Sequence, residues 1–528
     1  MNKLQFDIVV IGGSLGGCLA AYSAAKQGYR VILTEETDWI GGQLTNQGVP
    51  SDEHDFIEKF GCTTTYREFR NRVRDYYRNH PYFKDEIKAQ EHFNPGTGWV
   101  SRIAHEPRVA LHLINEMLLP FVANEQLQIW TKHKAVFAKT TNDEVTSVVV
   151  EDLNSGARTE LIAKFFIDGT DTGELLPLTN TEYVTGAEGP IYDEPHANPT
   201  PCPEDQQPIT WVAAVSYHEG ENHVMPKPEM YDYFRSIKMD YGDGPTDLLS
   251  WYGPSLEMKQ GNRKYKFGGE FEDGVTTVPP LFSYRQIVNK DSFDPEYQIH
   301  DATLINWPQN DYIFGNIIDT PDAEYHKYMA KQLTLSLIYW LQTEAERDDG
   351  KGIGYPELKL RGDILGTEDG LAQAPYIRES RRIKALFTVK EQDIAADFNE
   401  TLPRFWDTVG VGCYQIDVHM TTTTRKYFFT TTWPFEIPLG SLIPIRVKNL
   451  LPACKNIGTT HITNGCFRLH PVEWNIGEVA GYLASYCLTN KMTPQELYQD
   501  RERVKAFQDH LVQKGIQLHW PEDEVYAV

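Results

Sequence analysis

One pair of side chains in the chain has the types and the spacing that proton transfer needs. Histidine titrates near neutral pH, and Asp417 and His419 stand two residues apart in YQIDVHMTTT. On a strand this spacing points both side chains to one face, where the carboxylate would fix the imidazole tautomer or raise its basicity. We therefore expect Asp417 and His419 to be catalytic. A simple hydrogen-bonded pair on a polar sheet face is an equally good alternative.

A second histidine, His461, lies in the polar loop IGTTHITNGCFR and is also a catalytic candidate. Its alternative is a loop histidine that bonds a backbone carbonyl. His54 and His105 rank below it. The sequence has no cluster of His, Cys and Asp residues at convincing metal-ligand spacing, and no Gly-x-Ser-x-Gly turn of the kind that acyl transfer uses. We expect no metal.

Three arginines surround Glu379 in RESRRI, namely Arg378, Arg381 and Arg382. Guanidinium groups bind carboxylates or polyhydroxylated compounds through paired hydrogen bonds, so Arg378 and Arg382 are candidates for substrate binding. The box also contains its own counter-ion, and an internal salt-bridge network between two domains is the slightly favoured alternative.

The elements that would position such a site begin at the N-terminus. The sequence predicts a buried strand over 8–11, a glycine-rich turn, a helix of small residues that ends at Gly28, and a second strand over 30–34 that ends at Glu35 and Glu36. This order of strand, turn, helix, strand and acid is typical of the dinucleotide-binding βαβ unit.

Each residue type in this unit has a chemical reason. Gly12 permits the tight turn, Gly17 lets the helix pack closely on the strand, and N–H groups around Leu15 would receive a pyrophosphate. Glu35, with Glu36 beside it, would accept hydrogen bonds from ribose hydroxyls. The middle glycine of the fingerprint is Ser14 here. A glycine-rich turn in an unrelated α/β protein is the alternative interpretation.

A second glycine doublet follows the acidic residues. Gly41 and Gly42, with Gln43 and Leu44 after them, come six residues beyond Glu35, where backbone can pass close to a cofactor. Here the sequence resembles the FAD-dependent oxidoreductases of the glutathione-reductase-like fold. It is most similar to the large bacterial "FAD dependent oxidoreductase" family, which has an E…GGQ turn.

Three further segments resemble this family. Residues 163–177 resemble its "IDATGDGDL" turn, with Gly169 in place of the usual alanine, and residues 374–383 match its RESRRI box. Residues 449–484 resemble the C-terminal flavin segment, with Glu478 where glutamine is usual.

The resemblance implies FAD as the cofactor. It places the backbone of Val136 against adenine and His461 close to the flavin. It also implies that a helix opened near 474–477, including Asn475 and Ile476, directs its N-terminal dipole at the reduced flavin ring. The family has an Asp-x-His pair in a place comparable to that of the pair described above.

The fold class that follows is α/β, with a Rossmann-like FAD-binding domain that is discontinuous in sequence and an inserted α+β substrate domain. We assign 1–50, 100–180 and 435–490 to the FAD-binding domain, 51–99 to a helical and loop insertion, 181–434 to the substrate domain and 491–528 to a C-terminal helical tail. Further expected elements are strands at 128–137, 145–150, 165–168 and 419–433, a helix at 322–345, and one amphipathic tail helix after a capping box at Thr493.

Composition limits the possible partners. The 528 residues include 74 acidic and 50 basic side chains, for a formal net charge of −24, and such a surface repels phosphate backbones and anionic lipids. We expect a soluble protein that binds a small molecule, with no nucleic acid and no membrane partner. Seven scattered cysteines without a CxxC pair indicate a reducing, cytoplasmic setting.

These observations predict hydride transfer between flavin N5 and a small polar organic substrate, such as a sugar-like alcohol or an amine. The absence of CxxC opposes the disulfide reductases. A flavin-dependent monooxygenase, a flavoprotein of the tRNA-modifying type and a non-catalytic carbohydrate-binding protein are the alternatives.

Overall fold

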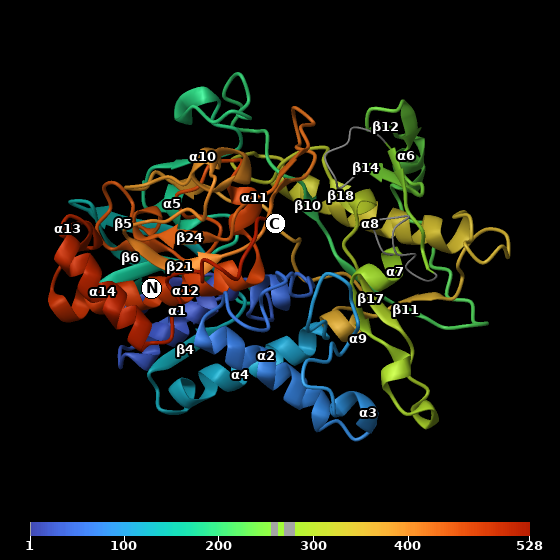
Figure 1. Cartoon of the computed structure of the whole chain (residues 1–528), viewed down its shortest axis with the longest axis horizontal. Helices are drawn as coiled ribbons and strands as arrows, with labels where there is room; N and C mark the ends of the chain where they lie inside the picture. Colours follow the sequence, from blue (N-terminus) through green and yellow to red (C-terminus); the bar gives the residue numbers. More distant parts are fainter. Residues whose placement is uncertain (1, 255–261, 269–279) are drawn as a thin grey trace.

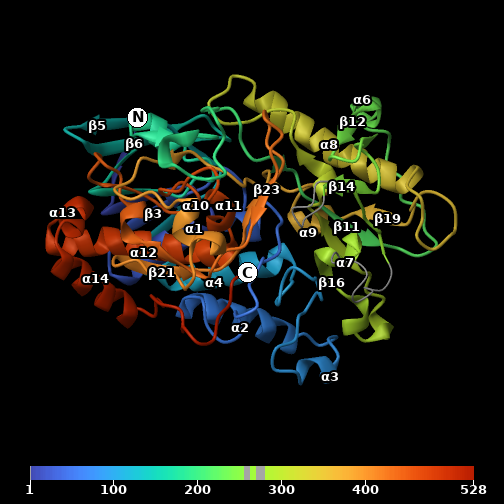
Figure 2. The ribbon, with the colours of Figure 1, turned by 45° about the horizontal axis from the view of Figure 1, so that its top comes forward.

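The computed structural model describes residues 2–254, 262–268 and 280–528. Two lobes lie side by side in both ribbon views (Figures 1 and 2). One lobe contains the first and last segments of the predicted FAD-binding domain, which share one sheet. The other lobe contains the long helix α8 (Ala323–Thr343). No helix among these residues has the length and apolar character needed to cross a membrane.

A five-stranded parallel sheet forms the centre of the first lobe. Its strand order is β25 (Leu450–Pro452), β8 (Phe165–Asp168), β2 (Ile8–Ile11), β3 (Val31–Thr34) and β4 (Leu127–Trp130). Segments far apart in the sequence therefore meet in one sheet, as the predicted discontinuous Rossmann-like fold requires. Residues of β2, β3 and β8 are fully buried, which explains why these strands are apolar without alternation.

Two helices pack against each other beside this sheet (Figure 2). The helix α1 (Leu15–Lys26) follows β2, and α12 (His470–Asn490) follows β25. The predicted opening of α12 near residue 474 is wrong. The helix begins at His470, because Pro471 occupies its first turn and supplies the backbone angle that a helix start needs.

A second sheet lies in the same lobe, in the order β1 (Asn2–Gln5), β7 (Arg158–Ile162), β6 (Glu144–Asp152) and β5 (His133–Thr141). The single strand predicted over 128–137 is two strands, β4 and β5, in different sheets. The chain turns between them at Lys132, which has a positive φ of 56°. Hydrophobic pattern alone does not show such a turn.

The second lobe is built on an antiparallel sheet in the order β16 (Gln286–Val288), β17 (Ala302–Ile305), β11 (Ala213–Tyr217) and β19 (Leu358–Leu360). It shares one apolar core with α8, whose predicted range is confirmed. This antiparallel sheet with helices is the inserted α+β part of the fold.

Two peripheral segments pack onto the first lobe. The helix α2 (Thr64–Arg78) buries its aromatic face in the same core as α1 and α12. The tail contains two helices, α13 (Pro494–Tyr498) and α14 (Arg501–Gln513), where one was predicted. The capping box at Thr493 is confirmed, and Asp500 caps a second helix start, which ends the first helix.

Candidate cofactor cradle and active site

Five glycines bring the backbones of three segments into close contact. A Cβ on Gly12 would lie 2.4 Å from the backbone of Gly169, and one on Gly17 would lie 2.0 Å from the Gly12 oxygen. A Cβ on Gly477 would lie 2.1 Å from the oxygen of Gly16. We call these residues the glycine cradle. No other residue type fits at these contacts, and the close approach leaves N–H groups and the end of α1 available to a dinucleotide.

Ser14 has a structural role that explains the departure from the glycine fingerprint. It is the N-cap of α1, and its hydroxyl oxygen accepts a hydrogen bond of 3.1 Å from the N–H of Gly17. The hydroxyl proton stays available to a phosphate oxygen. The N–H of Gly16 donates to Glu473 at 3.1 Å and is therefore already paired. The N–H groups predicted to bind the pyrophosphate are then those of Ser14 and Leu15.

The acidic end of β3 reaches back to the glycine turn. Glu35 accepts hydrogen bonds from the N–H groups of Gly13 at 2.9 Å and Thr37 at 2.8 Å. Burial raises its pKa, and the bonds from Thr37 act in the opposite direction. Glu36 pairs with Lys134 at 3.0 Å, and its pKa is raised to about 7 by burial and by the nearby Glu174.

The second doublet also turns as expected. Gly41 and Gly42 have φ of 107° and 53°, and the short helix η1 (Gly42–Leu44) follows. The side-chain amide of Gln43 donates to the Glu473 carboxylate at 2.7 Å and to the Arg468 carbonyl at 3.0 Å. The turn at 41–47 therefore lies against the segment that leads into α12.

Several buried polar atoms along this contact have no hydrogen-bond partner within the described part of the chain. They are Gln43 Oε1, Asn46 Oδ1, Gln47 Oε1, Ser51 Oγ, His461 Nε2 and Asn464 Oδ1. Buried polar atoms are nearly always paired in folded proteins, so unpaired atoms along one contact indicate a polar ligand. The residues present thus fit the flavin end of FAD.

A buried charge cluster beside the cradle was not predicted. Lys455 contacts Asp171 at 2.6 Å and Glu473 at 3.1 Å, and Glu473 also accepts a hydrogen bond from the N–H of Gly16 in the first turn of α1. Asp171 lies 284 residues away from Lys455 in the sequence, so the cluster forms only on folding. The pKa of Glu473 is raised by burial, against the effect of Lys455.

His419 is held between two carboxylates. Its Nδ1 lies 2.6 Å from Asp311 Oδ2, and its Nε2 lies 3.2 Å from Asp417 Oδ2, so the predicted contact of Asp417 with His419 is present. His419 directly follows β22 (Ile416–Val418), which pairs with β23 (Phe428–Thr430). Burial alone would raise the pKa of Asp417, but His419 and Arg468 lower it to about 2. Asp311 was missed because it lies 108 residues away.

His419, Asp417 and Arg468 line a small polar cavity between the lobes, of about 50 Å³. Arginines and aspartates are paired around it: Arg285 with Asp52 at 2.9 Å, Arg378 with Asp311 at 2.9 Å and Arg468 with Asp417 at 3.2 Å. Aromatic side chains form much of the remaining wall. A neighbouring cavity of about 320 Å³ shares Asp52, Tyr284 and Tyr414 with it.

On the lining residues of the polar cavity, four donors and one acceptor are buried without a partner among the residues that the structure describes. They are Arg378 Nε, Arg468 Nε, Asn306 Nδ2, Trp307 Nε1 and Asp417 Oδ1. The excess of donors suits a ligand that brings oxygen acceptors, such as hydroxyl or carboxylate groups.

The two arginines predicted to bind substrate lie in different places. Arg378 lines the polar cavity, whereas Arg382 is fully buried and pairs with Glu188 at 2.6 Å and with Glu379. His461 Nδ1 joins this second network at 2.9 Å from Glu379. Burial alone would lower the pKa of His461, but Glu379 raises it. Arg382 therefore lies in an internal salt-bridge network.

Three predicted cofactor residues have informative surroundings. Val136 lies at a bulge of β5, between the paired residues Ala135 and Phe137, so its backbone is outside the regular ladder. The Asn475 side chain donates to the carbonyl of Val409 at 3.3 Å, and Ile476 is fully buried in the apolar core. The roles of all three toward FAD stay predictions.

The lower-ranked histidines do not reach the polar cavity. His54 lines the neighbouring cavity and bonds the carbonyl of Gly61 at 3.1 Å, and burial lowers its pKa to about 4. His105 bonds the carbonyl of Ile103 at 2.5 Å.

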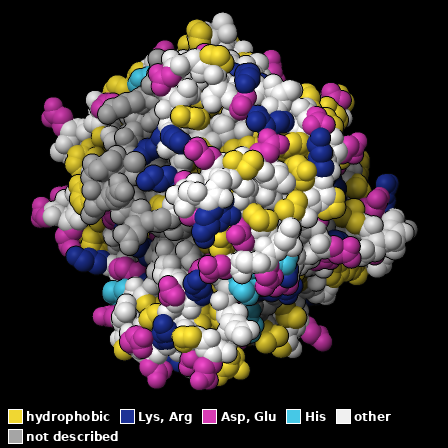
Figure 3. Space-filling model, turned by 90° about the vertical axis from the view of Figure 1, so that its right-hand side faces the viewer, with side chains coloured by type: hydrophobic (Ala, Val, Ile, Leu, Met, Phe, Trp, Pro, Cys, Tyr) yellow, Lys and Arg dark blue, Asp and Glu magenta, His cyan; other side chains and the backbone are white. Residues whose placement is uncertain are grey.

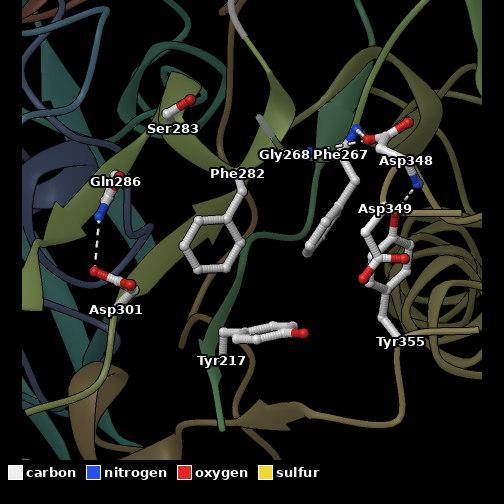
Figure 4. A pocket seen from close by; sticks show the side chains of 10 residues that line it. All are labelled: Tyr217, Phe267, Gly268, Phe282, Ser283, Gln286, Asp301, Asp348, Asp349 and Tyr355. Atoms are coloured by element: carbon white, nitrogen blue, oxygen red, sulfur yellow. Dashed lines mark hydrogen bonds between the residues drawn. The ribbon is translucent and has the colours of Figure 1, made fainter. Parts of the chain in front are cut away.

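The second lobe contains a separate cavity of about 420 Å³ (Figure 4). The rings of Tyr217, Phe267 and Phe282 face its interior, with Tyr355 behind Phe267. Among the described residues, none lines both this cavity and the polar cavity. We call it the aromatic cavity.

The fold and the cradle define a dinucleotide-binding α/β flavoprotein. The sequence matches the profile of the family described as FAD dependent oxidoreductase over residues 7–511, and the chain belongs to this family. It is an oxidoreductase enzyme with FAD as its cofactor. No curated protein matches the chain.

Similar solved structures are distant. A quinol-fumarate reductase with menaquinol molecules is 12% identical, with 97% of this chain and 76% of that chain covered and a TM-score of 0.34. A variant of E. coli quinol fumarate reductase is 10% identical, with coverages of 97% and 74% and a TM-score of 0.33. L-proline dehydrogenase from P. horikoshii is 14% identical, with a TM-score of 0.19; the match covers 35% of this chain and only 24% of that one. Similarity this weak supports no conclusion about the substrate.

Proposed function

We propose that the enzyme exchanges hydride between flavin N5 and a small hydroxylated substrate, a sugar-like alcohol, bound in the polar cavity. Bound FAD supplies the hydride acceptor or donor. The observation that carries the proposal is the set of unpartnered buried donors on Arg378, Arg468, Asn306 and Trp307, all on lining residues of this cavity. Hydroxyl oxygens would satisfy these donors, whereas an ammonium group would not.

The location of the cavity supports this choice. Asp52 lines it and follows Ser51, whose hydroxyl is one of the unpartnered atoms near the predicted flavin end. Arg468 also lines it, and its carbonyl accepts from Gln43. The same two segments thus border both the polar cavity and the proposed flavin site.

His419 is the residue that we propose to move the proton of the hydroxyl group. The shorter bond, 2.6 Å from Nδ1 to Asp311, fixes the ring, and the longer bond, 3.2 Å from Nε2 to Asp417, leaves Nε2 as the atom that exchanges a proton. Its side chain is 17% exposed, so most of the surrounding water is excluded.

Charge balance around the cavity favours a substrate of low net charge. Each of the three arginines among its described lining residues has an aspartate partner, so none of these guanidinium groups is left without a counter-ion to attract a strongly anionic compound. Trp307 and Tyr376 offer aromatic surface of the kind that sugar rings pack against. On the face of the second lobe in Figure 3, Lys and Arg are interspersed with Asp and Glu, which gives the tRNA alternative no support there.

A panel of sugars, polyols, hydroxy acids and amines tests the proposal. Each compound is mixed without oxygen with the purified flavin-bound protein, and loss of the oxidised flavin absorption is followed. We expect reduction by hydroxylated compounds and none by amines that lack hydroxyl groups. Reduction by amines alone, or by no member of the panel, would contradict it.

A further inference from the structure

The loop after β11 brings three metal-binding side chains together in the second lobe. The strand ends at Tyr217, and the residues that follow are HEGENH, with His218, Glu221 and His223 at positions one, four and six. Glu221 Oε2 lies 3.6 Å from His218 Nδ1 and 2.6 Å from His223 Nε2. All three ligand atoms lie within 4.8 Å of one another.

We propose that His218, Glu221 and His223 bind a divalent transition-metal cation of the zinc class, with solvent completing its coordination. Two imidazole nitrogens and one carboxylate oxygen are a ligand set that Zn²⁺ uses in proteins. Bonds of about 2.1 Å in a tetrahedral site place ligand atoms roughly 3.4 Å apart. The observed separations of 2.6 and 3.6 Å lie on either side of this value, so small side-chain rotations complete the site.

Contacts outside the triad hold its members in place. Ser216 Oγ lies 2.8 Å from His218 Nε2, which leaves Nδ1 of that ring directed at the site. Metal-binding histidines usually have such a partner on the second nitrogen. The ring of His300 stacks on His218 with centroids 3.7 Å apart, and it fixes the plane of the imidazole.

The loop backbone is anchored as well. The N–H of His218 donates to the carbonyl of Glu357 at 2.9 Å, and the N–H of His223 donates to that of Pro356 at 2.8 Å. The loop is thereby tied to the residues that precede β19. A site held in this way needs little ordering when the cation binds.

An ordinary hydrogen bond between Glu221 and His223 is the simpler interpretation, but it needs only two residues. It does not account for His218, whose Nδ1 faces the same carboxylate while Ser216 holds its other nitrogen. The sequence alone predicted no metal, because the spacing of these three ligands matches no familiar metal-binding motif. Tyr217, next to His218, lines the aromatic cavity, so the cation would rigidify one wall of it (Figure 4).

Calorimetric titration with ZnCl₂ tests the site in untagged, flavin-bound protein that a chelator has freed of metals. We expect one equivalent to bind with a Kd below about 10 µM at neutral pH. The H218A and H223A substitutions should each weaken binding by 10-fold or more, and S216A by a smaller factor. Binding does not involve the flavin, so the result is independent of the proposed function.

H112A is the matched control, because His112 forms an exposed pair with Glu116 at 3.4 Å and, among the described residues, this pair belongs to no group of three metal-binding side chains. It should bind zinc like the wild type. Circular dichroism melting checks that every variant is folded. The proposal fails if the wild type binds no zinc at about 100 µM, or if the H218A/H223A double variant still binds one equivalent with unchanged affinity.

Discussion

The glycine cradle and the polar cavity are built in opposite ways. In the cradle, backbone segments lie so close together that a Cβ atom would not fit between them, as where Gly17 contacts Gly12. The cavity depends on charged side chains from distant segments, as where Asp311 meets His419 and Arg378. A substitution that adds side-chain atoms at such a backbone contact causes a steric clash, whereas ion-paired side chains can be replaced or can move without one. The cradle should therefore determine whether FAD binds, and the cavity should determine what the enzyme oxidises.

The largest expected effect is in the cradle. Gly16→Val should abolish FAD binding and cost more than about 4 kcal/mol of stability, because even a Cβ there would lie 1.8 Å from the carbonyl oxygen of Ala453. The ratio of flavin to protein absorbance and a thermal melt measure both effects. Gly28→Ala is the control, since its Cβ meets nothing within 4 Å and only the positive φ of 88° opposes it. Equal flavin content in the Gly16 and Gly28 variants would show that the cradle is not required.

The difference between the cradle and the polar cavity also explains which parts of the site could be predicted from the sequence. The unit of β2, α1 and β3 was predicted because its glycines and Glu35 lie within 30 consecutive residues. Arg285 and Arg468, which line the cavity, and Asp311, which contacts His419 and Arg378, were missed, since only folding brings these separated residues together. The start of α12 was misplaced, because the small residues near 477 mark its contact with Gly16 and not its first turn.

Within the cavity, Asp311 is a positioning residue for His419. Asp311→Asn should slow flavin reduction about 100-fold, because an amide no longer fixes the orientation of the His419 ring. The substitution also removes the carboxylate that forms an ion pair with Arg378. Stopped-flow absorbance at several pH values measures the rate. A shifted pH profile with unchanged FAD content is expected. An unchanged profile with a lower melting temperature would show a purely structural role.

Arg378→Lys should have a smaller effect on the cavity than Asp311→Asn. Lysine keeps the charge near Asp311 but loses the planar donors of the guanidinium, including the unpartnered Nε. The substrate Kd should rise about 10-fold while the maximal rate of flavin reduction changes little, as measured by titration in the same assay. Arg382→Lys is the contrasting variant, since Arg382 lies in the internal network and should change stability instead. Identical substrate affinity in wild type and Arg378→Lys would remove Arg378 from the site.

The smallest expected effect concerns Glu478, which stands where the resembling family has glutamine. Burial raises its pKa to about 7, and its carboxylate accepts a 2.7 Å hydrogen bond from Thr65. Because the folded pKa exceeds the ordinary 4.5, the folded state binds the proton more tightly, and stability should fall as pH rises from about 4.5 to 7.

Glu478→Gln should remove this dependence and raise the melting temperature at pH 8 by about 2 to 3 °C. Scanning calorimetry at pH 5 and pH 8 measures the difference. A variant that is less stable than the wild type at both pH values would contradict the assignment of a buried, costly carboxylate.

The central claim is that His419 moves the substrate proton in the polar cavity while the cradle holds FAD. It is tested most directly by comparing anaerobic flavin reduction in the wild type and in His419→Asn, with the best hydroxylated substrate. We expect equal FAD content in both proteins and a rate that is lower in the variant by a factor of about 10² to 10⁴. Equal reduction rates in the two proteins would contradict it.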